Sequence, residues 1–138
     1  MNGHVMVVED QHTHRMMMGA ILMDLGLQVT SVNNGAVAID RLTLTPDLFD
    51  LIIMDWEMPE MNGLETVQEI RIREEKGGWK HVPVLAFTSN QRDGDMEKCI
   101  AAGMDDYLPK ESFLPKWQAL LLEKLNKWIP QKDSAAPS

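Results

Sequence analysis

The chain has 138 residues, 44% of them hydrophobic and 25% charged, which is enough for one hydrophobic core in one domain. Its formal net charge of −8 argues against direct binding to nucleic acid, because that usually requires a basic surface. The single cysteine, Cys99, has no disulfide partner in the chain, and no apolar run is long enough for a membrane helix. The start of the chain lacks a signal-peptide pattern, so we expect a cytoplasmic protein without membrane insertion.

Short apolar runs alternate along the chain with stretches of helical spacing. The sequence predicts strands over 4–8, 28–32, 50–54, 82–87 and 105–108. It predicts helices over 13–25, 35–44, 64–75, 95–102 and 113–129. In the first helix Met17, Ala20 and Ile21 recur at helical spacing, as Val67, Ile70 and Ile72 do in the third.

Strands that alternate with helices predict a parallel sheet with helices on both faces. The common arrangement for five strands is the flavodoxin-like, doubly wound sheet in the order 2-1-3-4-5, here with five helices. We expect residues 1–129 to form this domain. Residues 130–138 are small and polar, which is typical of a tail or the beginning of a linker.

Polar side chains follow four of the predicted strands, at the sheet edge where ligands bind in such folds. In chain order they are Glu9, Asp10, Asp55, Glu57, Thr88, Ser89 and Lys110. Clustered carboxylates repel one another unless a cation lies among them, and oxygen ligands suit Mg²⁺. A lysine suits a phosphate group, and an aspartate can itself accept a phosphoryl group as a nucleophile. The pattern therefore predicts magnesium-assisted phosphoryl transfer at this edge.

In this order and at these strand ends, the residues resemble the receiver domains of response regulators in two-component signalling. The shared features are Glu9-Asp10, Asp55 with Met58-Pro59, Met61 and Gly63, then Thr88, the stretch 101–107, and Lys110. The resemblance covers about residues 4–128. It implies a domain that takes a phosphoryl group from a histidine kinase or a histidine phosphotransfer protein. The domain would then bind an output partner through its last two helices and fifth strand.

The resemblance also implies a role for each residue. Asp55 is the phospho-acceptor and also a ligand of Mg²⁺ or Mn²⁺. Asp10, Glu9 (directly or through water) and the backbone carbonyl of Glu57 complete the protein's share of the metal shell. Lys110 pairs with the phosphoryl group. Thr88 and Tyr107 are the switch residues, while Glu57 and Asn90 stand where the family tunes dephosphorylation. Such a domain catalyses its own phosphorylation and dephosphorylation; a kinase activity belongs to it only within a hybrid histidine kinase.

One position departs from the family pattern, because Glu111 follows Lys110 where a proline is usual. The departure keeps a second reading open, a receiver-like interaction module that works without phosphorylation. A third reading is a magnesium-dependent phosphohydrolase with an aspartyl nucleophile, although the chain has no room for a cap region. Within the first reading the chain is either a stand-alone regulator or the receiver of a hybrid histidine kinase.

Overall fold

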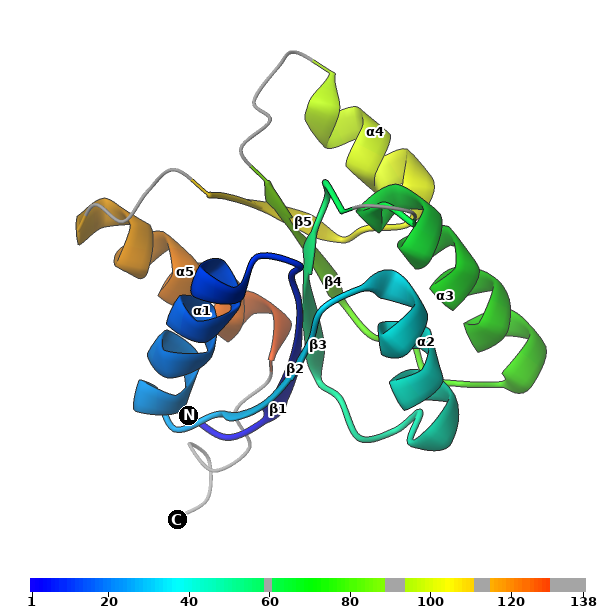
Figure 1. The fold of residues 1–138 in the computed structure, drawn as a ribbon, viewed down its shortest axis with the longest axis horizontal. Helices are drawn as coiled ribbons and strands as arrows, with labels where there is room; N and C mark the ends of the chain where they lie inside the picture. Colours follow the sequence, from blue (N-terminus) through cyan, green and yellow to red (C-terminus); the bar gives the residue numbers. More distant parts are fainter. Residues whose placement is uncertain (59–60, 89–93, 111–114, 130–138) are drawn as a thin grey trace.

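The structure is a computed structural model that describes residues 1–58, 61–88, 94–110 and 115–129. Strands and helices alternate throughout these ranges (Figure 1). The strands are β1 (His4–Val8), β2 (Gln28–Val32), β3 (Leu51–Asp55), β4 (Val84–Thr88) and β5 (Asp106–Pro109). The helices are α1 (His12–Asp24), α2 (Gly35–Leu44), α3 (Gly63–Gly77), α4 (Asp95–Ala102) and α5 (Pro115–Trp128). All strand pairs are parallel and follow the order β2-β1-β3-β4-β5, which confirms the predicted topology.

The sheet is buried on both faces, because its side chains alternate between two hydrophobic clusters. In β3, Leu51 and Ile53 belong to the cluster formed with α1 and α5, whereas Ile52 and Met54 belong to the cluster formed with α2, α3 and α4. Figure 1 shows the same division, with α1 and α5 on one side of the sheet and the other three helices opposite. The period of two along a strand thus explains why β3 is apolar at every position before Asp55.

Side-chain caps define the beginnings of two helices. Asn34 accepts a hydrogen bond from Val37 N at 2.8 Å at the start of α2. At the start of α3, Asn62 and Glu65 form a reciprocal capping box with N···O distances of 2.9 and 3.1 Å. The capping box fixes where the chain resumes a helix after β3, and so holds α3 next to the end of that strand.

Several element boundaries differ by one or two residues from the predicted ones. β3 ends at Asp55 itself rather than at residue 54. β4 begins at Val84, after Pro83, because proline has no N–H for the sheet and Val82 N donates to the Glu74 side chain instead. α3 continues to residue 77, and the left-handed backbone of Gly78 ends it.

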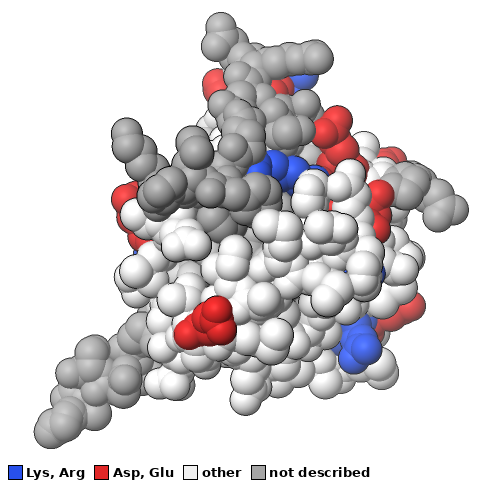
Figure 2. Space-filling view, turned by 60° about the vertical axis from the view of Figure 1, so that its left-hand side comes forward, with Lys and Arg blue, Asp and Glu red and all other residues white. Residues whose placement is uncertain are grey.

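The predicted buried face of α1 is wrong. The helix buries Met18 and Leu22, while Met17 and Ala20 are exposed. Three consecutive methionines make the helix apolar on more than one side, so its composition does not select a face. The side of the molecule that carries α1 and α5 accordingly shows few charged side chains (Figure 2).

The predicted face of α3 is wrong at one position, because Ile72 is 47% exposed while Val67 and Ile70 are fully buried. None of the helices in the described ranges combines the length and the hydrophobicity that a membrane crossing requires.

Candidate functional site

Asp55 lies at the carboxyl end of β3, between the ends of β1 and β4, and its exposed fraction is 1%. Its Oδ1 accepts hydrogen bonds from the backbone N of Glu57 at 3.1 Å and from Lys110 Nζ at 3.0 Å. Its Oδ2 is buried and has no hydrogen-bond donor among the described residues. A buried carboxylate oxygen without a partner is costly, so this atom marks the place where a ligand fits.

Glu9 and Asp10 follow β1 and bring two further carboxylates to the same edge. Glu9 is also 1% exposed, and its Oε2 accepts a hydrogen bond from Gln11 N at 3.1 Å. Its Oε1 forms an ion pair with Lys110 Nζ at 3.2 Å but accepts no hydrogen bond from the described residues. Asp10 is half-buried and therefore reaches the solvent side of the cluster.

One carboxylate oxygen from each of Glu9, Asp10 and Asp55 lies within 4.8 Å of the other two. Three hard oxygen donors at this spacing suit a divalent cation such as Mg²⁺, which keeps several water ligands beside one or two carboxylates. The unpartnered Asp55 Oδ2 independently supports this fit, because a cation would satisfy it. The donor set and the orphaned oxygen together make this cluster a candidate metal site.

The electrostatics of the cluster favour the neutral form of Asp55. Burial, reinforced by repulsion from Glu9, raises the pKa of Asp55 from its ordinary 3.8 to about 8, although Lys110 acts in the opposite direction. The pKa of Lys110 is raised as well: its burial would lower the value, but its hydrogen bond to Asp55 and the nearby Glu9 outweigh that effect. The single positive charge of Lys110 therefore does not balance the negative charges of Asp55 and Glu9 beside it.

Lys110 comes directly after β5, and its own backbone holds it near the site. Its N donates to the carbonyl of Thr88 at 2.9 Å, and its Nζ lies 5.6 Å from the centre of the Phe87 ring. The structure thus brings Lys110 to Asp55, as the order of the strand ends predicts. Glu111, the departure from the family pattern, lies outside the described residues.

The remaining predicted residues differ in how close to the site they are placed. Thr88 is the last residue of β4 and is fully buried. Tyr107 lies in β5, half-buried, and packs on the hydrophobic cluster of α2, α3 and α4. The side chain of Glu57 is exposed, although its N–H binds Asp55. Asn90 and Ser89 lie outside the described residues.

Comparison with known proteins decides the family. The model of the response regulator receiver domain matches residues 5–121. The chain belongs to this family. As a receiver domain it is 37% identical over 109 residues to the hybrid signal transduction histidine kinase L of Dictyostelium discoideum, covering 78% of this chain and 6% of that protein. It is 35% identical over 130 residues to the chemotaxis protein CheY-3 of Vibrio cholerae, with 91% of each chain covered.

A solved structure of a receiver domain supports the same family. The receiver domain of a sensor histidine kinase from Pseudomonas aeruginosa, with a magnesium ion coordinated in its active-site cleft, has a TM-score of 0.79 and 33% identity. The match covers 95% of this chain and all of that one. This receiver domain is therefore homologous to those of hybrid histidine kinases and of response regulators, but it spans only a small part of the hybrid kinases that it matches.

Sequence reasoning missed two residues that shape the site of this receiver domain. Arg15 Nη1 donates to the carbonyl of Glu9 at 2.8 Å and so holds the turn that presents the acidic pair. At Gly63, a Cβ atom would lie 2.5 Å from the carbonyl oxygen of Asp55, so only glycine lets α3 begin this close to the strand end. The signal for Arg15 was weak, since a basic residue six positions after Glu9 is common on helices. Gly63 is among the features shared with the family, but the sequence does not show that it contacts the backbone of Asp55.

Proposed function

We propose that Asp55 accepts a phosphoryl group from a phosphohistidine in the presence of Mg²⁺ or Mn²⁺, and that this changes the surface offered to an output partner. The observation that carries the proposal is the state of the Asp55 side chain. One of its oxygens is held by Lys110 and the backbone, while the other is buried and unpartnered beside Glu9 and Asp10. The carboxylate that a cation and a phosphoryl group would share is thus held in place by the fold on one oxygen only.

In the proposed reaction a carboxylate oxygen of Asp55 forms the new bond to phosphorus as the bond from phosphorus to the histidine nitrogen breaks. The bonding pair leaves with the imidazole, and the phosphoryl group remains on Asp55. When bound by Glu9, Asp10, Asp55 and the carbonyl of Glu57, a divalent cation neutralises charge on the carboxylates and on the transferring oxygens. Lys110 lies 3.0 Å from Asp55 Oδ1 and contributes the second positive charge.

The switch belongs to the same proposal. Thr88 ends the strand next to β3 and carries the one hydroxyl group of β4, which can hydrogen-bond a phosphoryl oxygen. Tyr107 is half-buried and lies opposite Ala86 in the neighbouring strand, and we propose that its ring turns inward when Thr88 moves. Glu57 and Asn90 are the residues that we propose tune hydrolysis of the acyl phosphate.

The proposed partners follow from the same chemistry. A histidine kinase or a histidine phosphotransfer protein supplies the phosphoryl group, and the output partner binds α4, β5 and α5. The similarity to a hybrid histidine kinase and to a CheY protein supports a donor of this class for either kind of chain. A cytoplasmic location is part of this proposal and rests on Cys99, which is a buried free thiol.

The experiment is phosphotransfer from a histidine phosphotransfer protein carrying radiolabelled phosphohistidine. We expect label to move to the chain when Mg²⁺ is present, and to stay on the donor with Asp55→Asn. Asp40→Asn is the matched control, because Asp40 is an exposed aspartate of α2. Equal transfer to wild type and to Asp55→Asn would contradict the proposal. So would a lack of transfer to the wild type from any phosphohistidine donor or small phosphodonor, a result that favours the phosphorylation-independent module.

A further inference from the structure

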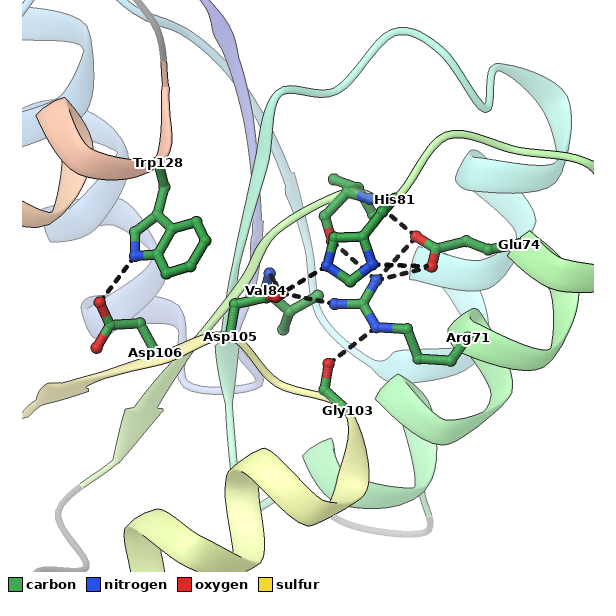
Figure 3. Close-up of polar contacts among 9 residues, drawn as sticks. Arg71, Glu74, His81, Val84, Gly103, Asp105, Asp106 and Trp128 are labelled. Atoms are coloured by element: carbon green, nitrogen blue, oxygen red, sulfur yellow. Dashed lines mark hydrogen bonds and ion pairs between the residues drawn. The ribbon is translucent and has the colours of Figure 1, made fainter.

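Two neighbouring aspartates lie at the start of β5, at the sheet edge opposite Asp55: Asp105 comes directly before the strand and Asp106 is its first residue. β5 is an edge strand and pairs only with β4. Because side chains alternate along an extended chain, Asp105 and Asp106 point to opposite sides of the sheet (Figure 3). Asp105 faces the side of α3, and Asp106 faces the side of α5. The start of the strand therefore has a carboxylate on each face.

On the α3 side, Asp105 ties the start of β5 to two other segments. Its Oδ2 accepts hydrogen bonds from Arg71 Nη2 at 2.7 Å and from Val84 N, the first residue of β4, at 2.8 Å. Its Oδ1 lies 2.8 Å from Nε2 of His81. Both oxygens of Asp105 are thus partnered, and one of them bridges α3 and β4.

Arg71 is the centre of this side of the network, and only 17% of its side chain is exposed. Its Nε donates to the carbonyl of Gly103 at 2.8 Å, at the residue that caps α4. Its Nη1 donates to both oxygens of Glu74 and to the carbonyl of Val82, all at 2.8–2.9 Å. Arg71 therefore fastens the carboxyl end of α4 and the approach to β4 to α3 (Figure 3).

On the α5 side, Asp106 makes an equally complete set of contacts. Its Oδ1 accepts hydrogen bonds from Lys124 Nζ and from Tyr107 N, each at 2.8 Å. Its Oδ2 accepts one from Trp128 Nε1 at 2.7 Å. Burial alone would raise the pKa of Asp106, but Lys124 and Trp128 outweigh it and hold the pKa below the ordinary value. The contacts of the folded chain therefore stabilise the charged form of Asp106.

Helix α4 buries few of its own side chains. It begins at Asp95, and the residue before it, Gly94, has a left-handed backbone and provides no side-chain cap. The helix buries only Asp95 and Cys99, while Met96 and Ile100 are 40% and 48% exposed. The end of α4 next to Gly103 is thus tied to α3 by Arg71.

We propose that Arg71, Asp105, Asp106, Lys124 and Trp128, here called the amino-edge clamp, form the fixed end about which α4, β5 and α5 move when Asp55 is phosphorylated. The proposal rests on the proposed function, which supplies the movement. Charge-assisted hydrogen bonds to buried carboxylates are the strongest polar contacts of a fold, and the clamp has them on both faces of β5. When a movement starts at Asp55, we therefore expect α4, β5 and α5 to tilt about the clamp and not to shift together as one body.

The tryptophan indoles allow a direct test on the full chain by nuclear magnetic resonance. Trp56 follows Asp55, while the N–H of Trp128 is itself a bond of the clamp. The two signals are assigned with Trp56→Phe and Trp128→Phe, and wild type is then titrated with beryllofluoride in the presence of Mg²⁺. We expect the Trp56 indole signal to shift, and the Trp128 signal to keep its position and its protection from hydrogen exchange.

The possible outcomes separate the two proposals. A comparable shift of both signals would overturn the clamp while leaving the phospho-acceptor intact. A lack of any shift would contradict the proposed function and, with it, the movement that the clamp guides. The decision comes from the titration of the wild type, and Trp128→Phe serves only to assign a signal.

A variant pair sharpens the result. Arg71→Gln removes the contacts of Arg71 to Gly103 and Asp105, whereas Arg73→Gln removes an exposed ion pair with Glu69 on the same helix. We expect beryllofluoride to shift the Trp128 signal in Arg71→Gln, because the fixed end is loosened, and to leave it unmoved in Arg73→Gln. A Trp128 signal that stays unmoved in a folded Arg71→Gln protein would show that Arg71 is no part of the clamp.

Discussion

The two edges of the sheet hold similar charged side chains, but their carboxylate oxygens differ in whether they have hydrogen-bond partners. At the amino edge, every carboxylate oxygen of Glu74 and Asp105 has a hydrogen-bond partner within a network around Arg71. At the carboxyl edge, Lys110 lies between Glu9 and Asp55, yet one buried oxygen of each carboxylate accepts no hydrogen bond from the described residues. The first arrangement stabilises the fold. The second leaves a free-energy cost that a cation or a phosphoryl group can remove.

The largest expected effect on stability comes from removing the hydrogen bonds and ion pairs of Arg71 at the amino edge. Arg71→Gln leaves the buried Glu74 and the half-buried Asp105 without their cation, and we expect it to lower the free energy of unfolding by about 3–5 kcal/mol. Arg73→Gln removes an exposed pair at 2.7 Å and should change that free energy by less than about 0.5 kcal/mol. Urea denaturation of both variants measures the difference. Equal effects would show that the amino-edge network is no more important than a surface ion pair.

The next expected effect is the stabilisation of the fold by a cation at the carboxyl edge. A cation that binds only the folded chain stabilises it by about 2.7 kcal/mol at a concentration 100 times its dissociation constant. We therefore expect Mg²⁺ to raise the melting temperature of the wild type and to have much less effect on Asp10→Asn. Asp24→Asn, at an exposed aspartate in α1, is the control that should respond like the wild type. A similar rise in Asp10→Asn would place the cation elsewhere.

The last effect concerns the proton that Asp55 retains without metal. Between about pH 4 and pH 8 the folded chain binds a proton at Asp55 that the unfolded chain has released, because the pKa is raised from 3.8 to about 8. The free energy of unfolding of the wild type should therefore fall as the pH rises through this window. Asp55→Asn removes this slope and should be the more stable protein at pH 7, by more than about 1.4 kcal/mol, the value of one pKa unit.

Denaturation of both proteins in metal-free buffer at several pH values measures this difference, with the exposed Asp40→Asn as the control. If Asp55→Asn were less stable than the wild type at pH 7, the wild-type carboxylate would be satisfied, and the contrast between the two edges would fail.

The sequence predicts the carboxyl edge well because parallel strands end at a common edge, so residues far apart such as Asp10, Asp55 and Lys110 meet without any knowledge of side-chain contacts. It does not predict the amino edge. Arg71 reads as one of many charges on α3, and Asp105-Asp106 reads as a family motif without partners. Their contacts depend on the position of α3 relative to the start of β5, which no local pattern specifies. The buried face of α1 was missed because Met16, Met17 and Met18 are all apolar.

The most direct test of the central claim is the location of the phosphoryl group after incubation with a small phosphodonor and Mg²⁺. Reduction with borohydride converts an aspartyl phosphate to homoserine, which peptide mass spectrometry then locates. The account predicts homoserine at position 55 alone, and its loss when the divalent cation is chelated. Modification of another aspartate, or modification of Asp55 to the same extent without a divalent cation, would contradict it.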